Sequence, residues 1–223
     1  MIIMSKNQPD YGVDAPEIIR GFYVAGGIAS LVSLVCLGLG SAMVAYGRRG
    51  KFNVRDKMLS RIDWQGSETV LDVGTGRGFL AVGTAKKLTT GKVVGIDIWR
   101  AEDLSGNSLE NTLANVQLEG VDGKVEVKNE DARTMSFADG TFDAVISLLC
   151  IHNIEGKEEQ ERACREIARV LKPGGKAVIG DYIGTGSYVK YFEQAGLTVT
   201  SHTSYVREAY AAMRVVEAVK PAA

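Results

Sequence analysis

The chain has 223 residues, of which 45% are hydrophobic, 24% charged and 7% aromatic, and its formal net charge is -1. This length and balance suit one globular domain with a buried core and exclude a disordered chain. Because the net charge is close to zero, no global basic field exists and nucleic acid is not the expected partner. The three cysteines lack CxxC or Cys/His spacing, which indicates reduced cytosolic thiols rather than a disulfide framework or a metal site.

The first distinctive segment, Phe22–Tyr46, is charge-free over 25 residues. A helix of this length measures about 37 Å, enough to cross a hydrocarbon core of about 30 Å with some tilt. Five basic residues follow between Arg48 and Lys57, which places the C-terminal side in the cytoplasm by the positive-inside rule. We expect a tail over residues 1–21, a transmembrane or membrane-associated helix over 22–46 and a catalytic domain over 51–223.

Alternatives to a spanning helix remain open for this segment. A buried helix of a soluble domain is one, although Gly26, Gly27, Gly38 and Gly40 weaken a helix in water. Small residues also recur at helix-neighbour spacing, which suits close packing in lipid and allows a homodimer through this helix. If the helix lies on the membrane or folds back, the segment Tyr11–Pro16 becomes a candidate lid.

From Lys51 onward, strand-like and helix-like segments alternate. This alternation predicts an α/β fold of the Rossmann-like, doubly wound kind, with a seven-stranded, mostly parallel sheet and right-handed crossovers. The expected strands cover residues 69–73, 92–97, 124–128, 142–149, 176–182, 198–202 and 212–219. The expected helices cover residues 79–88, 107–119, 158–171 and 188–195.

A glycine-rich turn joins the first expected strand to its helix within Val70–Phe79 (VLDVGTGRGF). Glycine permits a positive φ and a close approach of the backbone to a ligand at the helix N-terminus. The third glycine falls at Gly78, so the pattern is GxGxG, not the GxGxxG of dinucleotide sites, and no P-loop Lys-Ser/Thr follows. Taken alone, the pattern also fits any tight strand-to-helix turn.

Polar residues follow the next three strands as well. Asp97 ends the second strand, where a carboxylate accepts both hydroxyls of a ribose, although an N-cap role is also open. Ile98 and Trp99 come next and suit the two faces of an adenine ring, while Trp99 equally fits core packing. Asn129–Ala132 follows the third strand, where a carboxylate or amide binds a purine amine, and Ser147–His152 ends the fourth. Ligands of open α/β sheets bind outside the carboxyl ends of the strands, so we expect one shared crevice.

In order and spacing, these motifs resemble those of class I S-adenosylmethionine-dependent methyltransferases. The resemblance is to the broad group, methyltransferase type 11, that includes quinone, sterol and small-molecule methyltransferases. It rests on VLDVGTGRG, VVGIDIW, NEDARTMSFADGTFDAVIS and RVLKPGGKAVIGD, and it covers roughly residues 51–219. It implies S-adenosyl-L-methionine as cofactor, S-adenosyl-L-homocysteine as product and methyl transfer by in-line displacement.

Carried over by position, the resemblance also implies roles for individual residues. The three glycines of the turn and Asp72 hold the methionine part of the cofactor, and backbone groups near Ser147 face it. Asp97 takes the ribose hydroxyls, and Asp131 with the Ala132 N–H binds adenine. The expected cofactor-binding set is Asp72, Gly74, Thr75, Gly76, Gly78, Asp97, Ile98, Trp99, Asp131, Ala132, Ser147 and Leu148.

Catalysis requires mainly that the acceptor be aligned with the methyl carbon, and a base is needed only where the acceptor is a weak acid. His152 and Tyr182 are the expected catalytic residues, and His152 equally fits a helix-start or core-edge position. Asn153, Asp181 and Tyr205 lie near the same strand ends. Cys150 as a ligand for a metalloid acceptor is disfavoured, because the added cysteines of arsenite-methylating relatives are missing.

The polar segment Trp99–Asn107 is longer than the turn usual at this point in the group. We expect it to line the substrate entrance, with a surface loop as the alternative. Two classes of function remain: a membrane-tethered methyltransferase for a small, lipophilic or membrane-delivered acceptor, and a methyltransferase-fold binding or scaffold protein without transfer. The intact glycines and acidic residues favour the enzyme, for which a soluble metabolite or a protein stays open as acceptor.

Overall fold

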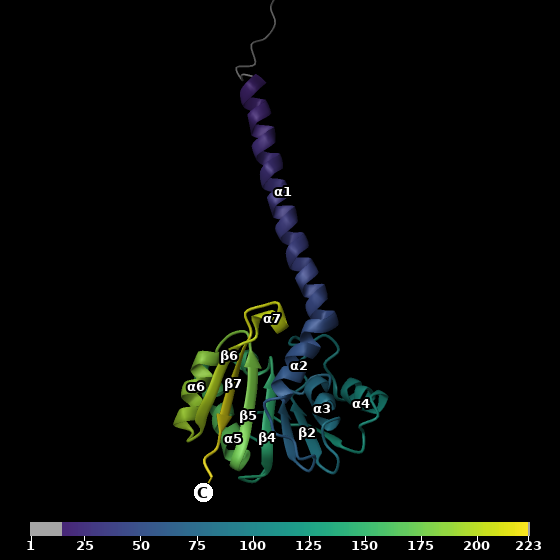
Figure 1. Ribbon diagram of the computed structural model, residues 1–223, viewed down its shortest axis with the longest axis vertical. Coiled ribbons are helices and arrows are strands. Elements are labelled where there is room, and N and C mark those ends of the chain that lie inside the picture. The colour runs from purple at the N-terminus through teal and green to yellow at the C-terminus, as the bar shows by residue number, and fades with distance from the viewer. Residues whose placement is uncertain (1–14, 223) are drawn as a thin grey trace, which may run out of the picture. The chain divides into compact units, whose positions relative to one another are not determined.

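The computed structural model describes residues 15–222, which divide into two compact units that meet between Ala45 and Tyr46 in the chain (Figure 1). The expected tail over residues 1–21 lies mostly outside the described residues, as does most of the candidate lid Tyr11–Pro16.

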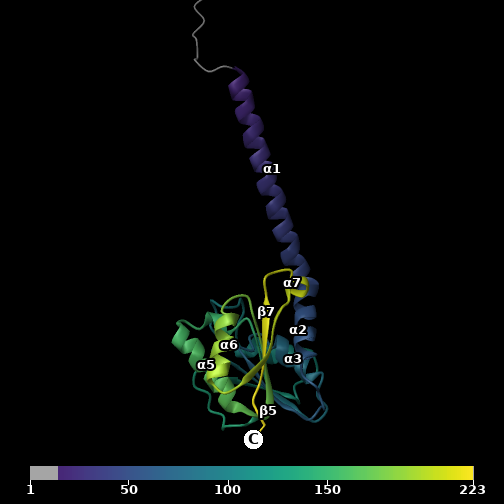
Figure 2. The same cartoon turned by 60° about the vertical axis from the view of Figure 1, so that its left-hand side comes forward.

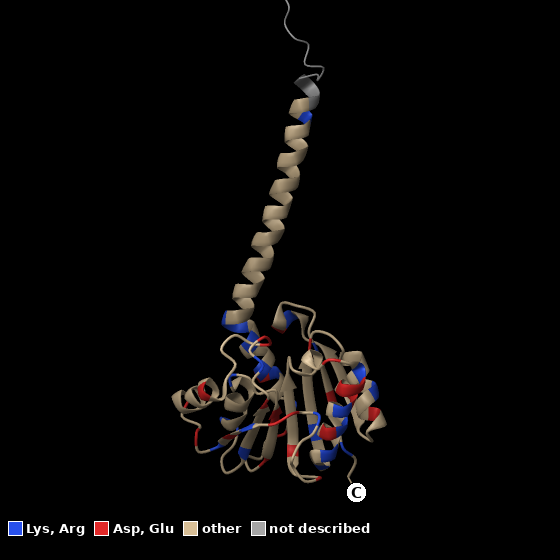
Figure 3. Cartoon of the chain, turned by 180° about the vertical axis from the view of Figure 1, so that it is seen from behind, with Lys and Arg blue, Asp and Glu red and all other residues tan. Residues whose placement is uncertain are grey.

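The described part of the first unit is one helix, α1, over Ala15–Ala45. Its large apolar side chains from Ile18 to Val44 are all exposed, and Figure 3 shows it almost free of charged residues. Continuous helix over Ile18–Leu59 reaches a mean hydropathy of 2.2, with none of its most apolar window buried. By length and composition this helix is able to cross a membrane.

The second unit holds a seven-stranded sheet in the order β3-β2-β1-β4-β5-β7-β6. Strands β1 to β5 pair in parallel, and β7 runs antiparallel to both of its neighbours. The predicted fold, a seven-stranded, mostly parallel α/β sheet preceded by an apolar helix, is therefore confirmed. The strands are β1 (Thr69–Val73), β2 (Lys92–Asp97), β3 (Val125–Asn129), β4 (Phe142–Leu148), β5 (Leu171–Asp181), β6 (Thr198–Ser204) and β7 (Arg214–Val219).

Helices cover both faces of this sheet (Figure 2). Residues of α2, α3 and α4 share one buried apolar cluster, and residues of α5 and α6 share the other. The helical elements of the second unit are the π-helical turn η1 (Tyr46–Gly50), α2 (Lys51–Leu59), α3 (Phe79–Ala85), α4 (Leu109–Leu118), the 3-10 turn η2 (Ile151–Asn153), α5 (Lys157–Val170), α6 (Thr185–Gln194) and α7 (Val206–Ala209).

Two parts of this arrangement differ from the prediction. Strand β5 begins at Leu171, five residues before the expected start at Lys176, because Leu171 already pairs with Phe142 across an irregularity in the β4 register. The helices α2 and α7 were not predicted. Their sequences are short and polar, and both are held by contact with each other and by residues in the buried apolar cluster on one face of the sheet, rather than by their own periodicity.

Candidate active site

A cavity of about 770 Å³ opens at the carboxyl ends of β1 to β4. Ten of the twelve expected cofactor-binding residues line it, and Trp99 and Ser147 do not. The lining members of that set are Asp72, Gly74, Thr75, Gly76, Gly78, Asp97, Ile98, Asp131, Ala132 and Leu148. The expected crevice is therefore present, and one continuous cavity connects the motifs after all four strands.

The glycines of the first turn are required by its geometry. Gly74, Gly76 and Gly78 have φ values of +70°, +52° and +82°, in the left-handed region that favours glycine. A Cβ atom at Gly74 would also overlap the side chain of Cys150. The turn thus brings bare backbone to the cavity wall, where α3 begins directly after Gly78.

Asp72 supplies a buried carboxylate at the end of β1. Its Oδ2 atom accepts hydrogen bonds from the Thr75 hydroxyl at 2.8 Å and from the Ala81 N–H at 2.9 Å. Its Oδ1 atom is buried without a hydrogen-bond partner among the described residues. Burial raises the pKa of Asp72 to about 7, against the lowering effect of the two donors. An ammonium group in the cavity would satisfy Oδ1, so this site fits the amino group of a methionine moiety.

Asp97 holds the turn and the following loop together. Its Oδ2 atom accepts the Gly76 N–H at 2.8 Å, and its Oδ1 atom accepts the Trp99 N–H at 2.8 Å and the Asn107 side-chain amide at 3.3 Å. Because each carboxylate oxygen has two lone pairs, Oδ2 retains an acceptor for a ligand hydroxyl. Asp97 is not the cap of α4, whose N-cap side chain is Ser108.

Asp131 is engaged by a residue that the sequence did not point to. Arg133 donates to both of its oxygens, with Nε at 2.9 and 3.0 Å and Nη2 at 2.6 Å. These hydrogen bonds lower the pKa of Asp131, so the carboxylate is ionised at neutral pH. Both residues line the cavity, and any contact of Asp131 with an adenine amine would use the lone pairs that Arg133 leaves.

The two expected residues outside the cavity have other surroundings. Ser147 is buried, and its hydroxyl donates to the Val73 carbonyl at 2.8 Å, which ties β4 to β1. Trp99 adopts a positive φ of 58° and is half-buried, with its indole N–H lacking a partner among the described residues. Beyond Trp99, the expected entrance segment contributes Arg100, Asp103, Leu104 and Asn107 to the cavity wall.

His152 and Tyr182 do not line the cavity, although Cys150 and Asn153 beside His152 do. The His152 Nδ1 atom lies 2.6 Å from Asp181 Oδ1, a close contact without the alignment of a hydrogen bond. Asp181 is fully buried and also accepts the backbone N–H groups of His152 and Tyr182. Burial raises the pKa of Asp181, and His152 opposes that rise.

Four residues from α2 and α3 form an aromatic and cationic end of the cavity. The rings of Phe52 and Phe79 meet edge to face with centroids 5.4 Å apart. Lys51 and Arg55 lie 5.1 to 5.6 Å from the centroids of the two rings. All four residues line the cavity, and three of them were missed because α2 itself was not predicted.

Comparison with known proteins agrees with this geometry. A family described as a methyltransferase domain matches residues 71–179. The chain is 32% identical over 132 residues to a protein named methyltransferase GfsG from Streptomyces halstedii, covering 59% of this chain and 44% of that one. It is 33% identical over 112 residues to a demethylmenaquinone methyltransferase from Bacteroides fragilis, covering 50% and 42%. The chain therefore matches less than half the length of these relatives.

Solved structures share the fold at lower identity. A methyltransferase from Aquifex aeolicus, described as SAM dependent, superposes with a TM-score of 0.61 at 22% identity, over 74% of this chain and 88% of that one. The cyclase SpnF superposes with a TM-score of 0.63 at 18% identity, over 76% and 81%. The family match identifies residues 71–179 as a methyltransferase domain, and the solved structures share the fold that contains it.

Proposed function

We propose that this protein transfers a methyl group from S-adenosylmethionine to a lipophilic acceptor delivered by a membrane. The observation that carries the proposal is the continuity of the cavity. It runs from the glycine turn and the buried Asp72 to the aromatic and cationic end on α2. Since α2 follows α1 after only the five residues of η1, this end belongs to the part of the chain next to the apolar helix.

Residues of the cavity match the parts of the proposed cofactor. The free Oδ1 atom of Asp72 suits the methionine ammonium, and the remaining lone pair of Asp97 Oδ2 suits a ribose hydroxyl. Asp131, Ala132 and Ile98 line the same cavity, where the first two would bind the adenine edge and Ile98 would offer the ring an apolar face. When bound, the cofactor supplies an activated methyl group, so the protein's task is to hold the acceptor in line with it.

The acceptor would be an apolar molecule, and the aromatic end of the cavity supports this assignment. Phe52 is 40% exposed and forms an edge-to-face pair with Phe79, so a planar ligand has an apolar surface to contact. Leu104 and Leu149 also line the cavity and add to its apolar wall. A quinone-type ring has these properties, and the similarity to a demethylmenaquinone methyltransferase points to the same class.

A base is needed if the acceptor loses a proton from a hydroxyl or an activated carbon. We assign this part to His152, whose partly exposed ring is held by Asp181 next to the cavity residues Cys150 and Asn153. Tyr182 packs against one of the core clusters, which leaves it the weaker candidate.

The test uses the full chain in lipid nanodiscs with cofactor labelled in the methyl group. A total lipid extract of the source cells and an aqueous metabolite extract serve as separate acceptor pools. We expect label to enter the organic phase and to depend on Asp97. Label found only in the aqueous pool would reject the lipophilic acceptor, while cofactor binding without any transfer would reject the enzymatic function.

The second candidate is a protein that uses the methyltransferase fold without methyl transfer. The similarity to SpnF, a cyclase, supports this candidate because it shows that the fold does not fix the reaction. The same experiment separates the two. A chain that binds cofactor in calorimetry but leaves every acceptor pool unlabelled would belong to the second class.

A further inference from the structure

The turn that follows α1 is fastened to a short helix from much later in the chain. A Cβ atom at Gly50 would lie 2.8 Å from the Glu208 carbonyl oxygen and 2.9 Å from the rings of Tyr46 and Tyr210. Glycine is therefore what allows α7 to touch η1. Lys57 on α2 adds an ion pair to Glu208 at 2.7 Å. These contacts join η1, α2 and α7 into one local assembly.

Tyr205, at the start of α7, strengthens this assembly from inside. Its fully buried ring lies 4.5 Å from the Lys57 ammonium, and its hydroxyl accepts a hydrogen bond from Arg61 Nε at 3.2 Å. The position of α7 is thus fixed by a buried aromatic ring, a cation–π contact and an ion pair. A four-residue helix would not be stable without such contacts.

The outer side of this assembly is both basic and apolar. Val206 and Tyr210 are 51% and 46% exposed, and Arg48, Arg49 and Arg207 are exposed as well. None of the three arginines has a carboxylate within 4.0 Å among residues 18–222. We call these five residues the η1–α7 surface. Exposed apolar side chains among unpaired cations are typical of a surface that meets anionic lipid.

Chain connectivity fixes where this surface must be if α1 spans a membrane. Residues Tyr46–Gly50 follow directly on Ala45, and five residues of helix extend only about 7.5 Å. The polar headgroup region on each side of a bilayer is about as thick. The segment Tyr46–Gly50, and α7 packed against it, would then lie at headgroup depth.

We propose that the η1–α7 surface rests on the anionic phospholipid leaflet, with its arginines at the headgroups and Val206 and Tyr210 in the interface. This proposal rests on the proposed function in one respect, the insertion of α1. It deepens that function, because the cavity residues Tyr46, Lys51 and Phe52 come from η1 and α2, the two elements that contact α7. An apolar acceptor would reach the aromatic end of the cavity directly from the bilayer.

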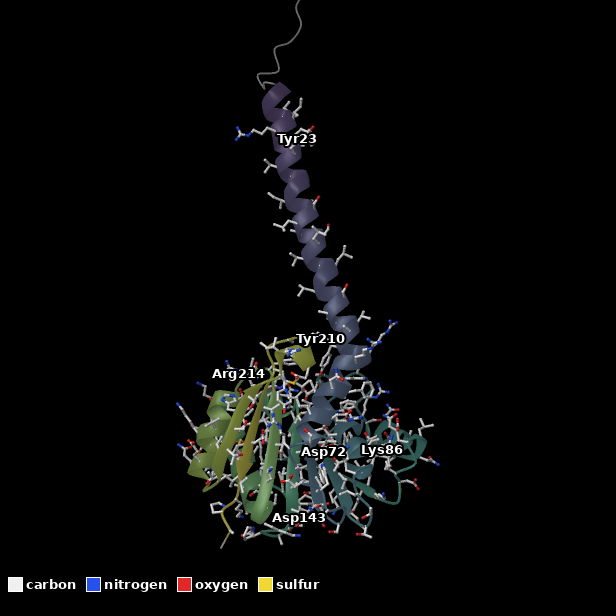
Figure 4. All side chains as sticks on the ribbon, in the orientation of Figure 1. Tyr23, Asp72, Lys86, Asp143, Tyr210 and Arg214 are labelled. Carbon is white, nitrogen blue, oxygen red and sulfur yellow. The ribbon has the colours of Figure 1, made fainter. Side chains whose placement is uncertain are left out.

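The experiment measures depth in the membrane with a nitrobenzoxadiazole label on single cysteines. The native Cys36 reports on α1, and in a Cys36→Ser background Val206→Cys reports on the η1–α7 surface. The matched control is Ser67→Cys, which is exposed next to Thr69, whose N–H bonds Asp143. Figure 4 shows Asp143 and Tyr210 at opposite ends of the second unit. Cys150 lines the cavity and Cys164 is buried, and both are replaced by Ala in every labelled protein so that each carries one cysteine.

The full chain is reconstituted in vesicles of phosphatidylcholine and phosphatidylglycerol that carry nitroxide-labelled lipid. We expect quenching of the labels at Cys36 and at position 206 but not at position 67. Replacing Arg48, Arg49 and Arg207 by Gln should reduce contact of position 206 about fivefold for each charge removed. Vesicles of phosphatidylcholine alone should have a similar effect.

The possible outcomes separate the two proposals. Quenching at Cys36 with no more quenching at position 206 than at position 67 would overturn the docking surface and leave α1 in the membrane. No quenching at Cys36 would reject the membrane location in the proposed function, and with it the docking surface. Equal quenching of position 206 by neutral and anionic vesicles would reject the role of the three arginines.

Discussion

The Nδ1 atom of His152 lies 2.6 Å from the Oδ1 atom of Asp181, a carboxylate with no exposed surface. The Tyr188 hydroxyl donates to the other oxygen of Asp181 at 3.2 Å, so the carboxylate is held from behind. This arrangement fixes the imidazole while 24% of its side chain stays exposed. A histidine oriented in this way by a buried carboxylate suits proton transfer at the edge of the cavity.

We expect His152→Ala to reduce turnover by about 10²-fold with unchanged cofactor affinity, since a positioned base contributes that much or more. The measurement pairs initial rates with calorimetry of S-adenosylhomocysteine binding. The conservative variant His152→Gln should not restore the rate. Unchanged turnover in His152→Ala would show that the residue is structural only.

Asp181→Asn tests the positioning role through the pH profile. In the native protein burial raises the pKa of Asp181, so as the pH falls through that value the carboxylate is protonated and the contact with His152 is lost. We therefore expect the turnover rate of the native protein to fall at acidic pH. We expect Asp181→Asn to have a low turnover rate that does not change over the same pH range. If the turnover rate of Asp181→Asn falls at acidic pH as in the native protein, protonation of Asp181 is not the cause of that fall.

We expect Asp72→Asn to weaken cofactor binding and to reduce the loss of folding stability as the pH rises. The pKa of Asp72 in the folded protein, about 7, lies above its ordinary value of 3.8. The contribution of Asp72 to the free energy of unfolding is therefore fully present below about pH 4 and is lost as the pH rises to about 7. At most this loss is about 4 kcal/mol, since each pKa unit corresponds to about 1.4 kcal/mol. Thermal unfolding as a function of pH should show a smaller loss in the variant, together with weaker S-adenosylhomocysteine binding. Equal pH dependence in both proteins would contradict the buried, ionisable state of Asp72.

Asp97→Ala should weaken cofactor binding by roughly ten- to hundredfold, because a charged acceptor contributes about 1.5–3 kcal/mol. The control is Asn107→Ala, which keeps the Asp97 carboxylate and removes the Asn107 hydrogen bonds to Asp97 Oδ1 at 3.3 Å and to the Arg100 carbonyl at 3.2 Å. Calorimetry should find this control within a few-fold of the native affinity. If both variants bind equally weakly, the loss reflects a disturbed loop and not a lost ribose contact.

Gly50→Ala and Gly47→Ala form a matched pair in the same turn. A Cβ atom at Gly50 would press on the Glu208 carbonyl, whereas nothing lies within 4 Å at Gly47. We expect Gly50→Ala to detach α7 and to speed hydrogen exchange there. We expect Gly47→Ala to be neutral or to stabilise by up to about 1 kcal/mol, as alanine does in a helix. Native exchange at residues 205–210 in Gly50→Ala would contradict the close packing of α7 on η1.

The sequence predicted what depends on local pattern. The boundaries of β1 and β2 agree with the prediction, because an apolar run followed by glycine or aspartate marks a strand end without help from the rest of the fold. The glycine turn and Asp97 were recognisable for the same reason. In contrast, the pairing of Asp131 with Arg133 depends on side-chain rotamers, and the contact of His152 with Asp181 spans 29 residues.

The side chain of Ser147 lies outside the cavity for a simple reason. Side chains alternate along a strand, and the last residues of β4 send Ser147 toward the Val73 carbonyl while Leu148 lines the cavity. A motif shows that a strand end approaches the ligand, but it does not show which of two neighbours faces it. The aromatic end of the cavity was missed for a larger reason: it depends on the packing of α2 against α3, which no local pattern records.

The position of β7 between β5 and β6 bears on how the protein is made. A ribosome has finished α1 long before it reaches Val219, so the apolar helix is available to the insertion machinery while the sheet still lacks an inner strand. Lys220, directly after β7, then donates to the carbonyls of Ala168 and Leu171, each at 2.8 Å, at the end of α5. The domain would therefore complete its folding late in synthesis, and if α1 enters a membrane as proposed, it would do so before the sheet is complete.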